Sequence, residues 1–164
     1  ISLTVVFGLG AAAQTLVGQS LGRENPNRAQ MYGFETARIC TFYTMIIGLI
    51  FILLPDLVLR IITNNDEIIA LGKPLLQVAG LAQVLYGAGI IFAYSLQSAG
   101  ATVYVMVVEV ITHWVIFLPL TYIYGVVLKG GILGAWWALP VYTFTFLLLN
   151  YFKFRSRTWM SLKI

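Results

Sequence analysis

The 164-residue chain is far more apolar than an ordinary globular domain: 60% of its residues are hydrophobic, 10% are charged, and its mean hydropathy is +0.89. The net charge of +4 does not indicate nucleic-acid binding, because Lys and Arg gather at the ends of apolar runs, as they do beside membrane spans. Cys40 is the only cysteine, which excludes an internal disulfide and predicts a packed thiol. The composition predicts an integral membrane protein.

Several apolar runs are about long enough to cross a hydrocarbon layer of ~30 Å at a helical rise of ~1.5 Å per residue. We expect five transmembrane helices, near residues 2–22, 30–54, 74–98, 102–127 and 132–152. The predicted fold is an all-α, polytopic transmembrane helix bundle over residues 1–152. A basic, interfacial, cytoplasmic tail that includes Trp159 follows over residues 153–164.

The first apolar run carries a face of small residues and leads into a basic turn. Gly18 and Gly22 have the small-xxx-small spacing that lets another helix approach closely. Asn25 is a candidate N-cap and Pro26 suits the first position of the next helix. The run has no initiator Met and no basic n-region, so it does not resemble a signal peptide, and we expect the chain to be part of a longer protein.

Breaks between the later helices follow from polar residues, glycine and proline. The stretch from Asp56 to Lys73 is interpreted as a water-exposed loop, with a turn and a helix start at residues 64–67. Gly100 can end one helix before the next begins, and Pro119 should kink the fourth span. Aromatic residues near predicted helix ends are typical of interfacial belts: Tyr122, Tyr124, Trp136 and Trp137.

The basic residues predict the orientation of the chain. With five spans, one face carries seven Lys and Arg residues, namely Arg23, Arg28, Arg38, Lys153, Arg155, Arg157 and Lys163. The opposite face carries three, namely Arg60, Lys73 and Lys129. The positive-inside rule therefore predicts a cytoplasmic C-terminus.

Three segments resemble, in order, the motifs of the multidrug and toxic compound extrusion (MATE) transporters. They are AQTLVGQSLGRENPNRA, then LQVAGLAQVLYGAGIIFAYSLQSAGATVYVMVVEVITHWVIFLPLTYIYG, and finally GGILGAWWAL. The resemblance implies most of the second six-helix lobe of a twelve-helix transporter, without that lobe's first helix and without the N-terminal lobe. It also implies export of organic, often cationic compounds across the bacterial inner membrane in exchange for H⁺ or Na⁺. The expected partners are the bilayer, the missing lobe and small organic substrates.

The chain departs from the family pattern at the positions where acids occur in some members. Ala101 stands where many members have Asp, and no acid lies in the third span around Gln83 to Ala88. This departure argues against a Na⁺ site in these helices and shifts an ion-coupling acid to the missing lobe or to Glu109.

Polar residues inside the predicted spans are the candidates for a substrate or proton pathway: Gln14, Gln83, Tyr86, Glu109 and His113. For the glutamines, Gln77 and Gln97 included, and for Tyr86, a bond to a neighbouring helix is favoured over substrate contact. Gly18, Gly22, Gly100 and Pro119 are assigned to helix packing and geometry.

Glu109 and His113 lie one turn apart on the fourth span and can therefore face the same side. His113 could hold the carboxylate and exchange a proton near neutral pH, forming a relay. A neutral, hydrogen-bonded Glu that ties two helices is favoured, because the pair lies closer to one surface than the midplane expected for coupling sites.

Other chemistries find little support. Gly8, Gly10 and Ala13 match a dinucleotide-binding pattern, but they lie inside a membrane span rather than between a strand and a helix. One Cys and one His argue against a metal site, and no enzyme constellation or cofactor motif is present. The alternatives to a drug exporter are a lipid-linked saccharide flippase, which should carry Arg and Lys in its cleft, and a non-transporting membrane subunit.

Overall fold

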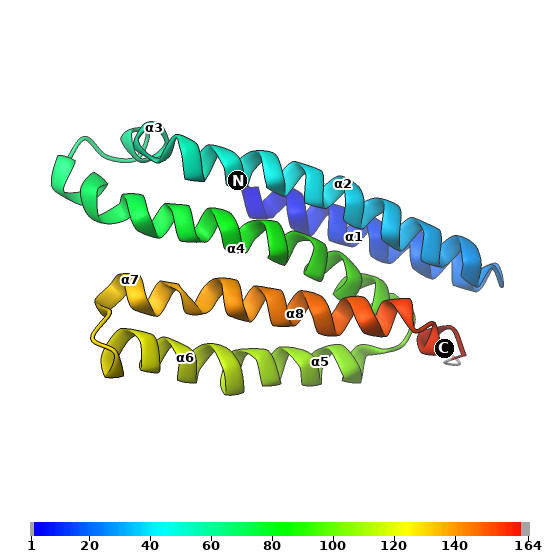
Figure 1. Cartoon of the computed structure of the whole chain (residues 1–164). Coiled ribbons are helices and arrows are strands. Elements are labelled where there is room, and N and C mark those ends of the chain that lie inside the picture. The colour runs from blue at the N-terminus through cyan, green and yellow to red at the C-terminus, as the bar shows by residue number, and fades with distance from the viewer. Residues whose placement is uncertain (1, 162–164) are drawn as a thin grey trace.

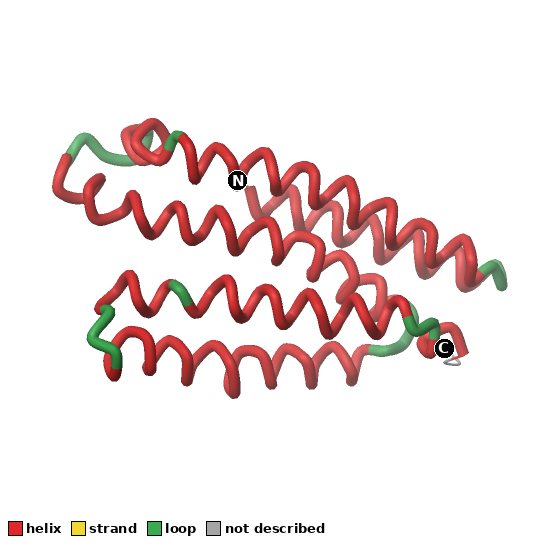
Figure 2. Tube along the Cα trace, in the orientation of Figure 1, coloured by secondary structure: helices red, strands yellow, loops and turns green. Residues whose placement is uncertain are grey.

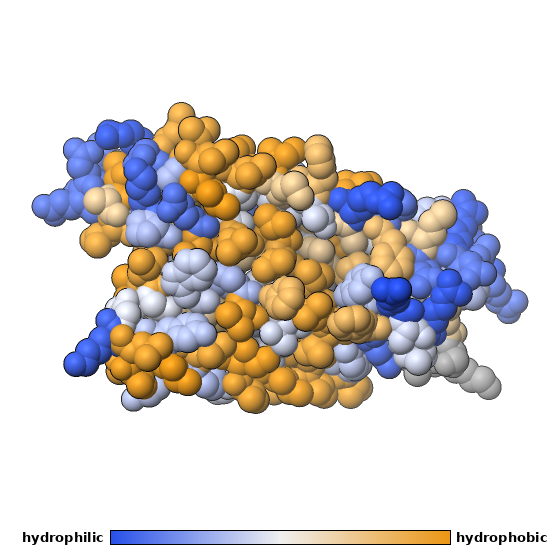
Figure 3. Space-filling view, in the orientation of Figure 1, coloured by the Kyte–Doolittle hydropathy of each residue, from blue (hydrophilic) through white to orange (hydrophobic). Residues whose placement is uncertain are grey.

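The computed structural model describes residues 2–161, and within that range the chain consists only of helices and short connections. Five helical segments are long and apolar enough to cross a membrane: Ser2–Gly22, Pro26–Leu53, Asp66–Ser98, Thr102–Val127 and Gly131–Arg155. They lie side by side along one direction (Figures 1 and 2), and a wide apolar band separates polar residues at the two ends (Figure 3). The chain is therefore an all-α, multi-pass membrane bundle, as predicted.

Helices α1 (Ser2–Gly22) and α2 (Pro26–Leu53) form a tight hairpin whose turn has the predicted capping. The Asn25 side chain accepts a hydrogen bond from the backbone N–H of Arg28 at 3.1 Å, and Pro26 is the first helical residue. The cap satisfies one of the backbone donors that every helix start leaves unpaired.

The predicted loop from Asp56 to Lys73 is wrong over most of its length. It contains the short helix α3 (Pro55–Arg60) and the first turns of α4 (Asp66–Ser98). The Asn65 side chain accepts from the N–H groups of Glu67 and Ile68, so the helix begins well before Pro74, which α4 contains in its interior. The helix start expected at residues 64–67 is confirmed; charged residues here extend the helix into water instead of ending it.

The fourth span alternates between α-helical and π-helical turns. Helix α5 (Thr102–Val110) follows Gly100, whose positive φ of 81° suits the expected helix break. It continues as the π-helical stretch η1 (Ile111–Phe117), helix α6 (Leu118–Tyr122) and a second π-helical stretch, η2 (Ile123–Val127). We expected a kink at Pro119, and the structure places this residue in α6 with a π-helical stretch on each side. Like proline, π-helical turns interrupt the regular hydrogen bonding of an α-helix.

The fifth span consists of α7 (Gly131–Trp136) and α8 (Ala138–Arg155), and the short 3₁₀ helix η3 (Thr158–Ser161) follows. The side chain of Trp159, which we expected at the membrane interface, is packed against the protein and 1% exposed. Its ring stacks on Phe154 at 4.8 Å between centroids, and its indole N–H donates to the Phe154 carbonyl. The tail folds back because an aromatic ring and a backbone acceptor are both available to this Trp.

Helix α4 lies at the centre and packs against α1, α2 and α8. Its closest approach is to α2, where a Cβ built on Gly80 would lie 2.9 Å from the Gly48 carbonyl oxygen, so only glycine fits on either side. The close helix contact that we predicted at Gly18 and Gly22 is absent among the described residues. Gly18 meets only Ser98 at an ordinary 3.7 Å, and nothing in the described chain lies within 4 Å of a Cβ at Gly22.

Candidate substrate cleft

A cleft of about 450 Å³ opens between α1 and α8, with α4 as its floor and α2 at one side. Its wall is mostly apolar and carries a few polar groups from α4 and α8. The lining residues include Phe7, Phe51, Ala82, Gln83, Tyr86, Tyr142 and Thr143. Both the volume and this mixture are typical of sites for small organic molecules. We call this feature the α4–α8 cleft.

Aromatic rings connect the α4–α8 cleft to the fourth span. The Tyr86 ring stacks on Phe146 at 5.9 Å, and Phe146 lies 6.1 Å from Tyr142. Tyr142 in turn packs against His113 at 4.6 Å and against Phe117 at 5.6 Å. The fold therefore brings Tyr86 and His113, two predicted candidates from different helices, to opposite ends of one aromatic row.

Gln83 contributes an unpaired hydrogen-bond donor to the cleft wall. Its side-chain Nε2 is shielded from solvent and has no hydrogen-bond partner among the described residues. A buried amide loses free energy unless its donors are satisfied, so Gln83 is the residue of the cleft lining whose polar group is left unpaired within the described bundle. Gln77 differs, because its Nε2 donates to the Ile52 carbonyl at 3.1 Å and ties α4 to α2 as the packing interpretation predicted.

Glu109 and His113 lie together, but not through the carboxylate. The His113 Nδ1 is 2.9 Å from the backbone carbonyl oxygen of Glu109, and both side chains are exposed on the surface of the chain. Because a carbonyl oxygen can only accept, Nδ1 must carry the proton in this contact. The imidazole is thereby oriented by the helix backbone and by Tyr142, rather than by the Glu109 side chain.

The remaining candidate, Gln14, is partly buried on α1 and does not line the α4–α8 cleft. Sequence reasoning missed Tyr142, Thr143 and Phe146, which complete the cleft and the aromatic row. The i,i+4 spacing of Tyr142 and Phe146 on an apolar helix was an available signal, although such pairs are common in cores. Within residues 2–161 no three His, Cys, Asp or Glu side chains are grouped closely enough to hold a metal ion.

The bundle and its apolar band define a multi-pass helical membrane protein with a mostly apolar cleft among its helices. The family model MatE matches residues 1–123, and the chain belongs to this family. The motif resemblance is thus confirmed over three quarters of the sequence.

Curated relatives agree with this assignment. The chain is 26% identical over 136 residues to the probable multidrug resistance protein NorM of Thermotoga maritima, covering 83% of this chain and 29% of that protein. It is 23% identical over 163 residues to the multidrug resistance protein NorM of Burkholderia vietnamiensis, covering 96% and 35%. It is 23% identical over 136 residues to human multidrug and toxin extrusion protein 2, covering 83% and 23%. No solved structure gives a significant match.

The chain therefore spans about a third or less of the length of these relatives.

Proposed function

We propose that this chain is part of a secondary active transporter that exports organic, often cationic compounds in exchange for H⁺ or Na⁺, with no other cofactor. The observation that carries the proposal is the α4–α8 cleft, a mostly apolar volume lined by two tyrosines and the amide residue Gln83. Aromatic faces attract organic cations, while the amide can orient a polar group without fixing one substrate. Membership of the MatE family and the names of the relatives support the same activity.

The flippase alternative is less well supported. A cleft for a pyrophosphate-linked lipid should present cationic side chains, whereas the residues that line the α4–α8 cleft include neither Lys nor Arg.

The proposal also covers the surroundings of the bundle: the exposed faces of these five spans contact the bilayer and an N-terminal lobe of the same protein. Residues 1–164 alone should not support efflux, because the substrate path implied by the resemblance lies between two lobes.

The cleft is tested by changing Gln83 in the full-length gene product. Gln83→Leu should lower efflux of a cationic dye such as ethidium several-fold from a drug-sensitive bacterial strain, at equal levels of folded protein. Gln77→Leu is the matched control on the same helix, because that amide is already bonded within the bundle. Unchanged dye efflux and unchanged dye specificity in the Gln83 variant would show that the cleft is not part of the substrate path.

We also propose a bacterial inner-membrane location with the C-terminus in the cytoplasm. On the end that holds the α1–α2 turn, Arg38 pairs with Glu35 at 3.1 Å, and no ion pair with a carboxylate is formed among the described residues by Arg23, Arg28, Lys153, Arg155 and Arg157. At the other end Arg60 pairs with Asp66 at 3.2 Å and Lys73 with Asp56 at 2.7 Å. The positive-inside rule counts Lys and Arg themselves rather than net charge, so the seven basic residues at the first end, against three at the other, support the proposed orientation.

Cysteine labelling in intact cells tests the orientation. A cysteine at position 65 should react with an impermeant maleimide, and one at position 157 should react only after the cells are opened. Cys40 is buried and provides the unlabelled background. The reverse pattern would refute the proposed orientation.

A further inference from the structure

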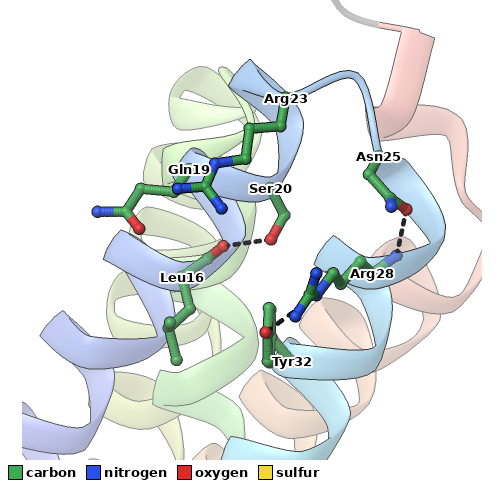
Figure 4. A pocket seen from close by; sticks show the side chains of 7 residues that line it. All are labelled: Leu16, Gln19, Ser20, Arg23, Asn25, Arg28 and Tyr32. Carbon is green, nitrogen blue, oxygen red and sulfur yellow. Dashed lines mark hydrogen bonds between the residues drawn. The ribbon is translucent and has the colours of Figure 1, made fainter.

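A second, smaller pocket lies at the turn between α1 and α2, and it shares no lining residue with the α4–α8 cleft. It has a volume of about 120 Å³, well above the ~10–15 Å³ needed for one water molecule, so a group the size of a phosphate fits. The side chains that line it come from the end of α1 and the start of α2 (Figure 4): Leu16, Gln19, Ser20, Arg23, Asn25, Arg28 and Tyr32. We call it the turn pocket.

The turn pocket is rich in donors and its lining contains no carboxylate. Arg28 donates from Nε to the Tyr32 hydroxyl at 3.0 Å and its guanidinium lies 5.5 Å from the centre of the Tyr32 ring. This contact holds the side chain while leaving its two terminal NH₂ groups available. Arg23 makes no ion pair within the part of the chain that the structure describes, so the two guanidinium groups provide uncompensated positive charge.

The lining of the turn pocket offers more hydrogen-bond donors than acceptors, which favours an anion over a cation. The Asn25 side-chain oxygen accepts from the Arg28 backbone N–H, so its NH₂ group is the part left to bind a ligand. The Ser20 hydroxyl donates to the Leu16 carbonyl at 2.7 Å. Forked guanidinium donors beside an amide match the oxygens of a phosphate group.

The position of the turn pocket points to a lipid as the source of the phosphate. Leu16 is 37% exposed and belongs to the apolar helix α1, whereas Arg23 and Arg28 flank the α1–α2 turn. This turn lies at an end of the bundle (Figure 1) where hydrophilic residues gather (Figure 3). Lipid phosphates occupy this boundary between hydrocarbon and water. Basic pockets between helices at such a boundary bind anionic head groups.

We propose that the turn pocket binds the phosphate of an anionic phospholipid, with Arg23 and Arg28 as its ligands and Leu16 against the first part of the acyl chains. The site does not depend on the proposed transport activity, and its occupation would hold α1 against α2 at the membrane surface.

The test is lipid binding by the purified full-length gene product in detergent, measured by native mass spectrometry. The probes are a short-chain phosphatidylglycerol, the matching phosphatidylcholine and inorganic phosphate. Arg23→Gln with Arg28→Gln should weaken phosphatidylglycerol binding about tenfold or more, since each basic residue near a membrane contributes several-fold to binding of anionic lipid. The matched control, Arg38→Gln with Lys153→Gln, removes two charges from the same end but none from the turn pocket, and should change binding less than about twofold.

A second variant keeps the result decisive if the double Arg variant does not fold. Gln19→Glu places an exposed carboxylate at the pocket and leaves both arginines in place, so it should also weaken phosphatidylglycerol binding and leave phosphatidylcholine binding unchanged. Equal losses in the control pair would overturn the proposal in favour of diffuse surface charge. Displacement of phosphatidylglycerol by millimolar inorganic phosphate would overturn the lipid assignment and make this a soluble-phosphate site.

Discussion

Helix α4 and the fourth span, Thr102–Val127, are both apolar enough to cross a membrane, yet they occupy opposite environments. Half of the most apolar 18-residue window of α4 is buried within the chain, against 17% for the fourth span. One difference between them is the presence of small residues at helix contacts. Helix α4 places small residues such as Gly80, Ala82 and Gly87 at its contacts, whereas the fourth span exposes large ones such as Val103 and Trp114. Hydropathy thus marks a helix as long and apolar enough to span a membrane, and small residues permit the close helix contacts that bury it within this bundle.

The strongest test of this comparison removes a leucine from each helix. Leu96 of α4 is 0% exposed and Leu118 of the fourth span is 47% exposed. Leu96→Ala should cost about 2–5 kcal/mol of stability through the cavity that it leaves, and Leu118→Ala at most about 0.5 kcal/mol. Denaturant unfolding of the full-length gene product in detergent measures both. Similar losses at the two positions would mean that the fourth span is as tightly packed as α4 in the assembled protein.

The glycine contact between α2 and α4 provides a second test. Gly80→Ala should destabilise the protein by about 1–3 kcal/mol, because the new methyl group meets the Gly48 carbonyl. Gly22→Ala is the control, since a Cβ there has nothing within 4 Å; it should be neutral or stabilising by up to about 1 kcal/mol. The thermal midpoint of each variant in detergent measures the difference. A larger loss at Gly22 would reveal a partner helix at that face.

The two helices also differ in how they begin. Asn65 caps α4 through its side chain, while Ala101 precedes α5 without a side-chain cap. Asn65→Ala should cost about 1 kcal/mol, whereas the neighbouring Asn64→Ala should have little effect. Hydrogen exchange in the first turn of α4 would locate the change. Unaltered exchange in the Asn65 variant would show that packing, not capping, fixes this helix start.

The smallest effect is expected at Glu109 on the exposed fourth span. His113 donates to the Glu109 backbone carbonyl, a contact that Glu109→Gln leaves intact. Proton-driven dye efflux by the full-length gene product should therefore keep its pH profile, with its rate within about twofold of the parent. A profile that flattens in this variant, but not in Tyr122→Phe on the same span, would instead establish the carboxylate as a coupling group.

The sequence by itself determined the number of the membrane spans and their helical type. Uninterrupted apolar length identifies a membrane helix regardless of its neighbours, and local chemistry at Asn25, Pro26 and Gly100 marked helix boundaries correctly. The family was equally visible, because its motifs are local in sequence. The start of α4 at residues 64–67 was recognised, but the turns that follow it up to Pro74 were assigned to a loop, because polar residues can either end a helix or extend it and periodicity does not distinguish the two cases.

Only the tertiary structure decided which surfaces meet. Gly18 and Gly22 had the expected spacing but lack a close partner, while Gly48 and Gly80, thirty-two positions apart, are in backbone contact. Trp159 was placed at the interface by composition and is buried because Phe154 lies beneath it. The α4–α8 cleft likewise joins residues from four helices. Contacts of this kind depend on helix rotation and crossing, which follow from the packing of all neighbours at once, so no local pattern in the sequence specifies them.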